Sequence, residues 1–183
     1  MATALPAGLT PGTYAIDPSH TTASFSVRHA GIAKVRGTIA VTGGTITAGE
    51  DLESSSVTAT LDAASVNTGD ANRDNHLRSA DFWAAEERPT WTFESTAIRA
   101  AGGDHVIAGD LTINGITQAV ELETEFTGTA TDPFGNARAG FEAEVEIKRA
   151  DFGLTWNAAL ETGGFLVGDK VKISLDVSAI KQG

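Results

Sequence analysis

The sequence predicts an all-β fold, an eight-stranded antiparallel barrel with one or two short helical insertions. Apolar and polar side chains alternate along eight segments, so each predicted strand has one dry face and one wet face, as is typical of antiparallel sheets. Turn-forming residues separate these segments. Several segments are about 8–12 residues long, as tilted barrel strands are. Closure also removes exposed edges, which favours a barrel over a two-sheet sandwich.

The chain begins with a segment rich in Pro, Gly and Ala, residues 1–12, which predicts a flexible tail before a single domain at 13–183. The alternation then recurs without an internal repeat or a linker. The inward positions are Phe25 and Val27; Ile39 and Val41; Val57, Ala59 and Leu61; Trp91 and Phe93; Ile107, Leu111 and Ile113; Val120, Leu122 and Phe126; Phe141, Val145 and Ile147; and Val171, Ile173, Leu175 and Val177. Asn114-Gly115 is a strong hairpin signal, and Gly43-Gly44 and Asp132–Gly135 mark further turns.

Two segments interrupt the β pattern. Residues 70–86 lack the alternation; Asp70 can cap a helix start there, and Pro89 predicts its end. Residues 155–163, TWNAALETG, predict a short helix or loop before the last strand. The triplet Asp151-Phe152-Gly153 lacks every other kinase motif, so we interpret it as a strand end and turn.

Composition excludes several functions. The 183 residues carry a net charge of −11, which disfavours nucleic-acid binding. The chain has no cysteine, so disulfide and thiolate chemistry are absent. No segment approaches the ~20 apolar residues of a transmembrane helix, and the first residues do not resemble a signal peptide, so we expect a cytoplasmic protein. The sequence leaves open whether it forms a homodimer.

The stretch RDNHLRSADFW, residues 73–83, combines cations with apolar and aromatic side chains. One interpretation is a surface helix whose neighbouring Arg and Asp residues pair, as in Arg73–Asp74 or Arg78–Asp81. The other is an amphipathic gate at the mouth of a barrel. In that gate Leu77, Phe82 and Trp83 would seal the lumen, and Arg73, His76 or Arg78 would meet a polar head group.

The candidate ligand-binding residues form three sets. The alternation assigns Phe25, Val27, Trp91, Phe93, Leu111, Phe126, Phe141 and Val145 to the lumen. We assign His20, Arg28, Arg73, His76, Leu77, Phe82 and Trp83 to the rim or gate. Trp156 is a core residue or part of the ligand channel.

The histidines could serve other chemistry. A base at His76 or His20, oriented by Asp74 or Asp81, would make the protein a hydrolytic or isomerising enzyme. The four histidines lie far apart without a His-x-His or HExxH motif, so we predict no metal, no cofactor and no catalytic residue. A barrel filled by its own side chains, serving as a stress-related interaction module, is a further alternative.

Several long motifs span Tyr14 to Val177: YAIDPSHTTASFSVRHAGIAKVRGTI, VNTGDANRDNHLRSADFW, RPTWTFEST, GDLTINGITQAVEL and ADFGLTWN with VGDKVKISLDV. Together they resemble the YceI-like, polyisoprenoid-binding protein family. The resemblance implies a lipocalin-like barrel with a helical segment and a long apolar pocket. It also implies a lipid ligand (a polyisoprenoid, an isoprenoid quinone or a fatty-acid-like chain) for a carrier, store or sequestering protein involved in transport. Many members of the family are periplasmic, unlike the compartment expected here.

Overall fold

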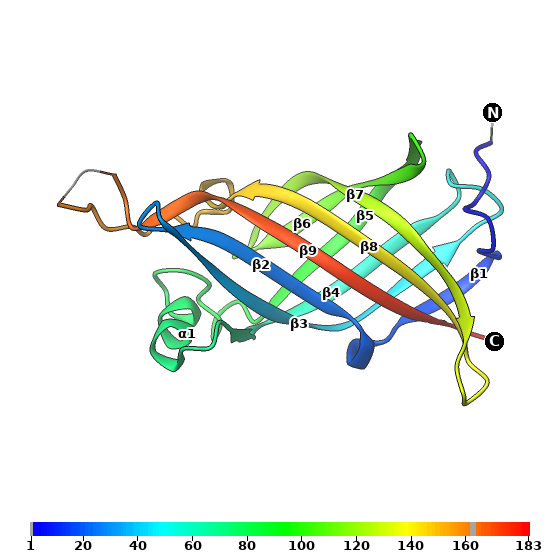
Figure 1. The fold of residues 1–183 in the computed structure, drawn as a ribbon, viewed down its shortest axis with the longest axis horizontal. Helices are drawn as coiled ribbons and strands as arrows, with labels where there is room; N and C mark the ends of the chain where they lie inside the picture. The colour runs from blue at the N-terminus through cyan, green and yellow to red at the C-terminus, as the bar shows by residue number, and fades with distance from the viewer. Residues whose placement is uncertain (1, 162–163) are drawn as a thin grey trace.

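The structure is a computed structural model that describes residues 2–161 and 164–183. Most of those residues lie in antiparallel strands (Figure 1). The strands are β1 (Gly12–Ile16), β2 (Thr22–His29), β3 (Ala33–Ala48), β4 (Ser56–Asn67), β5 (Thr90–Ala101), β6 (Asp104–Ile113), β7 (Ile116–Thr131), β8 (Ala137–Lys148) and β9 (Val167–Lys181). The helices are α1 (Ala71–Arg78) and two 3-10 turns, η1 (Pro18–His20) and η2 (Arg149–Phe152).

The strands close into a barrel that is eight strands around, which confirms the predicted fold class. Strands β2 to β9 form a ring in the order β3-β2-β9-β8-β7-β6-β5-β4, and β4 pairs with β3 to complete it. The additional strand, β1, does not widen the barrel, because it pairs with β3 and β9, the same two neighbours as β2. The two are one strand interrupted by η1, where Pro18 cannot donate a ladder hydrogen bond and the Asp17 side chain caps the turn.

The helical insertion is shorter than predicted. Asp70 caps α1 as expected, since its side chain accepts a hydrogen bond from the Arg73 backbone N–H. The helix nevertheless ends at Arg78 and does not continue toward Pro89. Ser79 is the reason, because it adopts an extended conformation and its hydroxyl and backbone N–H both donate to the His76 carbonyl.

The second insertion lies in the connection before β9. Its described part, residues 155–161, contains no helix and instead forms an isolated bridge between Ala159 and Phe165. Thr162 and Gly163, also in the predicted segment, lie outside the described residues. The RADFG motif forms η2 at the end of β8, so it is the strand end and turn that the sequence predicted.

The two ends of the barrel differ. The end that we call the mouth carries α1, the β2–β3 turn and the connection before β9, whereas both termini lie at the opposite end, which we call the base (Figure 1). At the base, residues 2–11 lie against the barrel: the Leu52 backbone N–H donates to the Thr3 carbonyl, and Leu5 and Leu9 pack beside Tyr14.

Candidate ligand-binding site

An elongated apolar cavity of about 570 Å³ occupies the barrel. Its wall alternates with the outer face as the sequence predicted, so Val145 and Ile173 line the cavity whereas Glu144 and Lys172 face solvent. Many inward aliphatic side chains are only half-buried, although they point to the middle of the protein. They retain accessible surface because the space in front of them is empty. The cavity contradicts the filled-barrel alternative.

The structure brings together nearly all the predicted ligand-binding residues. Fifteen line this one cavity: Phe25, Val27, Arg28, Arg73, His76, Leu77, Phe82, Trp83, Trp91, Phe93, Leu111, Phe126, Phe141, Val145 and Trp156. They come from β2, β5, β6, β7, β8, α1 and the connections that follow α1 and η2. Alternation therefore identified the strand residues of the wall, and composition and resemblance identified those at the mouth. Contact of each residue with a ligand stays a prediction.

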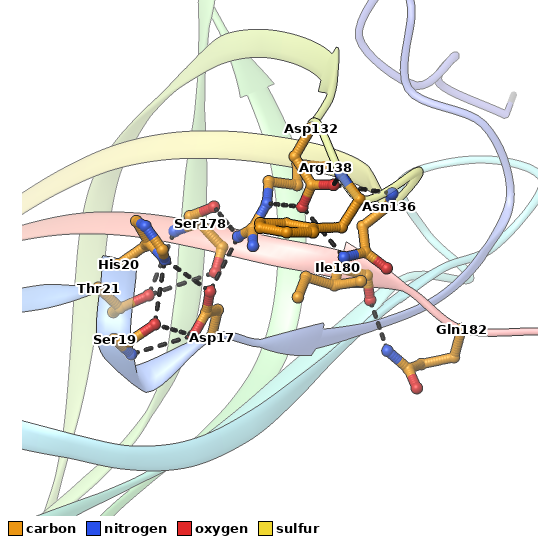
Figure 2. A network of polar contacts seen from close by, with 11 residues as sticks. Asp17, Ser19, His20, Thr21, Asp132, Asn136, Arg138, Ser178, Ile180 and Gln182 are labelled. Carbon is orange, nitrogen blue, oxygen red and sulfur yellow. Dashed lines mark hydrogen bonds and ion pairs between the residues drawn. The ribbon is translucent and has the colours of Figure 1, made fainter.

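His20 is the exception and does not belong to the rim. It lies in η1 on the outer surface, where its Nδ1 is 2.8 Å from Asp17 Oδ2 (Figure 2). The same carboxylate lies 2.9 Å from Arg138 Nη1, and Asp132 contacts the other side of that guanidinium at 2.8 Å. Composition and resemblance placed His20 at the rim, because it lies beside the first long strand. The η1 turn instead carries it out of the barrel wall.

This outer network shifts two carboxyl groups. The hydrogen bond from Arg138 is the main reason that the pKa of Asp17 lies far below its ordinary value, with smaller contributions from Ser19 and His20. The backbone N–H of Asn136 does most to lower the pKa of Asp132, assisted by Arg138. Both carboxylates hold the ends of strands together and have no contact with the cavity.

Aromatic rings close the mouth of the cavity. Phe82 and Trp83 are 8% and 6% exposed, so they belong to the hydrophobic core as well as to the cavity wall. Trp83 packs edge-on against Trp91, with ring centroids 5.0 Å apart, and against Phe25 at 5.9 Å. The ring of His76 fits between Phe82 and Trp156, at 5.1 and 4.6 Å. These contacts fix the rings as one packed layer over the bore.

Polar contacts anchor α1 to the end of β4. Buried Asp74 accepts hydrogen bonds from the Thr68 backbone N–H at 2.9 Å and from its hydroxyl at 2.5 Å. Arg73 donates to the hydroxyl and carbonyl of the same residue, and Arg78 donates to the Ala64 carbonyl. The predicted Arg73–Asp74 and Arg78–Asp81 pairs are therefore wrong, because these side chains bind the β4–α1 connection or, for Asp81, His76.

Sequence reasoning missed Arg149. It is 7% exposed and donates to the carbonyls of Leu154 at 2.6 Å, Trp156 at 2.9 Å and Gly168 at 2.9 Å. Burial lowers the pKa of its guanidinium. No ion pair to Arg149 is found within residues 2–161 and 164–183, so main-chain dipoles stabilise its charge. Nothing in the RADFG motif predicts this role, which depends on chain segments that follow it.

Sequence reasoning also missed the base of the cavity. Leu5, Pro6 and Leu9 line the cavity there, together with Leu52 from the β3–β4 connection. The sequence predicts a flexible tail over residues 1–12, whereas in the structure Leu5 and Leu9 of that segment pack beside Tyr14. The spacing of Leu5 and Leu9 is the one signal in the tail that indicates an apolar contact surface.

The charged residues of the cavity wall are all cations. They are Arg28, Arg73 and Arg149, and all three lie at the mouth. The β2–β9 pairing shifts register between Val27 and His29, so Arg28 lies at an irregular point of the strand. The wall contains no aspartate or glutamate. Over the described ranges 2–161 and 164–183 the structure has no cluster of His, Asp or Glu able to hold a metal ion.

The site thus combines an apolar bore with a cationic opening. Apolar walls exclude water and stabilise a chain of similar width, whereas arginines bind carboxylate or phosphate oxygens. None of the helices in the described part of the chain is both long and apolar enough to span a bilayer.

Comparisons with known proteins agree with this geometry. Residues 14–179 match the family model described as YceI-like domain. Protein YceI from Escherichia coli O17:K52:H18 is 42% identical over 144 residues, which cover 77% of this chain and 75% of that protein.

Solved structures share the fold. BcnA from Burkholderia cenocepacia superposes with a TM-score of 0.75 at 22% identity, covering 89% of this chain and 98% of that one. A polyisoprenoid binding domain from Saccharophagus degradans, implicated in plant cell wall breakdown, gives a TM-score of 0.69 at 14% identity, covering 94% of this chain and all of that one.

Proposed function

The chain belongs to the YceI-like domain family, and we propose that it binds one long-chain lipid inside the barrel. The observation that carries this proposal is the continuous apolar cavity of about 570 Å³. A polyisoprenoid, an isoprenoid quinone or a fatty-acid-like chain has the required shape. The protein would then serve as a carrier, a store or a sequestering protein for that lipid.

The size of the cavity sets the size of the ligand. If each carbon takes about the ~30 Å³ that a liquid water molecule occupies, the cavity holds about 20 carbon atoms, or roughly four five-carbon units. Burial contributes about 0.8 kcal/mol for each CH₂-sized group before ordering costs are subtracted. Such a chain therefore supplies ample driving force without any polar contact along the bore.

The opening supports an anionic head group. Arg28 and Arg73 lie at the mouth beside the end of the bore, and no carboxylate shares the wall with them. A ligand whose tail fills the bore would place its head among these guanidinium groups. Carboxylate and phosphate accept the charge-assisted hydrogen bonds that arginine donates.

The fold neighbour from Saccharophagus degradans supports the chemical class of the ligand. That protein is a polyisoprenoid binding domain, and the superposition covers 94% of this chain. Because the two sequences are only 14% identical, the choice of a prenyl chain over an acyl chain depends on experiment.

Organic extraction of the purified protein, followed by mass spectrometry, tests the proposal. We expect one lipid per protein with about 20 carbons in its tail. The control is the same extraction from Ala143→Phe, a variant whose new side chain fills the bore. Extracts with no lipid, combined with failure to take up added prenyl or fatty-acid chains, would contradict the proposal.

One observation favours a second function. His76 Nε2 lies 2.9 Å from Asp81 Oδ2 at the cavity mouth, which is the base-and-carboxylate pair that the enzymatic alternative requires. His76→Gln would separate the two functions, because loss of turnover of a bound lipid with lipid uptake retained indicates an enzyme. If the wild-type protein leaves the bound lipid chemically unchanged after prolonged incubation, the result indicates a binding protein.

A further inference from the structure

Two apolar side chains project from the mouth into solvent. Ile32, in the β2–β3 turn, is 87% exposed, and Phe165, in the connection before β9, is 64% exposed. The two segments lie side by side, because the Ala30 backbone N–H donates to the Leu166 carbonyl at 2.7 Å. Gly31 and Phe165 also line a common shallow hollow. Residues 28–36 and 164–166, which we call the docking loops, are therefore neighbouring segments at the mouth end of the barrel (Figure 1).

The first docking loop lies in a stretch of this acidic protein that contains cations and no carboxylate. Residues 18–49 contain Arg28, Lys34 and Arg36 and no aspartate or glutamate, while the rest of the chain holds ten cations and twenty-four carboxylates. All three cations are exposed, and none forms an ion pair within the described residues 2–161 and 164–183. Glu161 and Asp169 are the exposed carboxylates closest in sequence to Phe165.

The same loops border the lipid cavity. Arg28, His29 and Leu166 line its mouth. A surface that combines apolar tips with unpaired cations matches the anionic interface of a lipid bilayer, where apolar side chains enter the acyl boundary and cations bind the head groups. A globular partner protein would have to cover tips on two separate loops.

We propose that the docking loops form a membrane-docking surface that holds the mouth of the cavity against an anionic lipid bilayer. The proposal relies on the proposed function for its purpose, the transfer of a lipid between bilayer and bore, but docking itself does not require a filled bore. Lys34 and Arg36 contact the anionic head groups, and Ile32 and Phe165 enter the interface between them. The acidic remainder of the barrel is repelled, which orients the mouth toward the bilayer.

Flotation with vesicles tests this proposal in the full-length protein. The wild type should bind vesicles of mixed phosphatidylcholine and phosphatidylglycerol, and should bind pure phosphatidylcholine far less. Arg36→Gln should lower binding about fivefold, and added salt should weaken binding because it screens exposed charges. Phe165→Ser should lower binding about tenfold, through lost burial of one aromatic side chain.

Matched variants at the base provide the controls. Arg99→Gln removes an exposed arginine of β5 that pairs with Glu121, and Phe134→Ser removes a side chain that is 88% exposed in the β7–β8 turn. Both should leave vesicle binding unchanged. Equal losses at mouth and base, no preference for phosphatidylglycerol, or no binding to any vesicle would overturn the proposal.

The bore-filling variant Ala143→Phe keeps the two proposals apart. Lost lipid uptake with retained vesicle binding supports docking that is independent of the bore. If the wild-type protein binds vesicles but takes up no lipid, the result would contradict the proposed function and still support the docking surface.

Discussion

Filling the bore with one side chain should shorten the lipid that the protein binds. Ala143 lines the cavity from the middle of β8, between outward-facing Glu142 and Glu144. Phenylalanine at this position adds the six carbon atoms of the ring, or about 180 Å³ at ~30 Å³ for each heavy atom. That is about a third of the 570 Å³ cavity.

The loss of volume translates into a loss of affinity that depends on chain length. A tail of about 20 carbons would leave at least one five-carbon unit outside the bore. At ~0.8 kcal/mol for each CH₂-sized group, the lost burial free energy is about 4 kcal/mol. Affinity for that tail should fall roughly a thousandfold. A tail of about ten carbons fits in the remaining space and should bind as tightly as before.

Competition with a fluorescent fatty acid measures both affinities in Ala143→Phe, Glu142→Phe and the wild type. Glu142→Phe is the matched control, because it adds the same ring to the outer face of the same strand. Folding stability of Ala143→Phe should not decrease, since the new ring enters an empty apolar space. Equal weakening for long and short tails, or equal effects in the two variants, would refute the assignment of the bore as the lipid site.

Two further predictions concern the stability of the barrel, and a third concerns the cavity. Arg138→Gln should destabilise the protein at neutral pH, because Arg138 holds the pKa of Asp17 far below its ordinary value. A depressed carboxyl pKa contributes stability above the unfolded pKa of about 4. The difference in unfolding free energy between wild type and variant should therefore shrink as the pH falls below that value, and a difference that grows in acid would contradict the ion pair. Gly109→Val should lower the free energy of unfolding by about 1–3 kcal/mol, because a Cβ there would lie 2.5 Å from the Phe93 ring and 2.6 Å from the Glu94 carbonyl oxygen. Chemical denaturation measures the change, and an unchanged midpoint would contradict this close packing. Lipid uptake should change the emission of the three tryptophans, all of which line the cavity, whereas an unaltered spectrum on saturation would place the lipid elsewhere.

The alternation of apolar and polar residues in the sequence was sufficient to predict the barrel and most of its lining strand positions. A β-strand turns its side chains to opposite faces with period two, so Trp91, Phe93 and Val145 could be assigned to the inner face from local pattern alone. Their wet neighbours, such as Glu144, made the opposite assignment too costly. The same reasoning found Asp70 as a helix cap, because capping also depends on a few adjacent residues.

Only the tertiary structure decided which ends of those strands meet and what covers them. His20 precedes β2 by two residues, yet η1 directs it outward to Asp17, and Asp17 in turn pairs with Arg138 from a distant part of the chain. Arg149 reaches the mouth through carbonyls supplied after η2, and Leu5 reaches the base through the packing of the N-terminal segment. Periodicity is a local property of a strand and survives in the sequence, whereas barrel closure and end coverage depend on long-range contacts that no local pattern records.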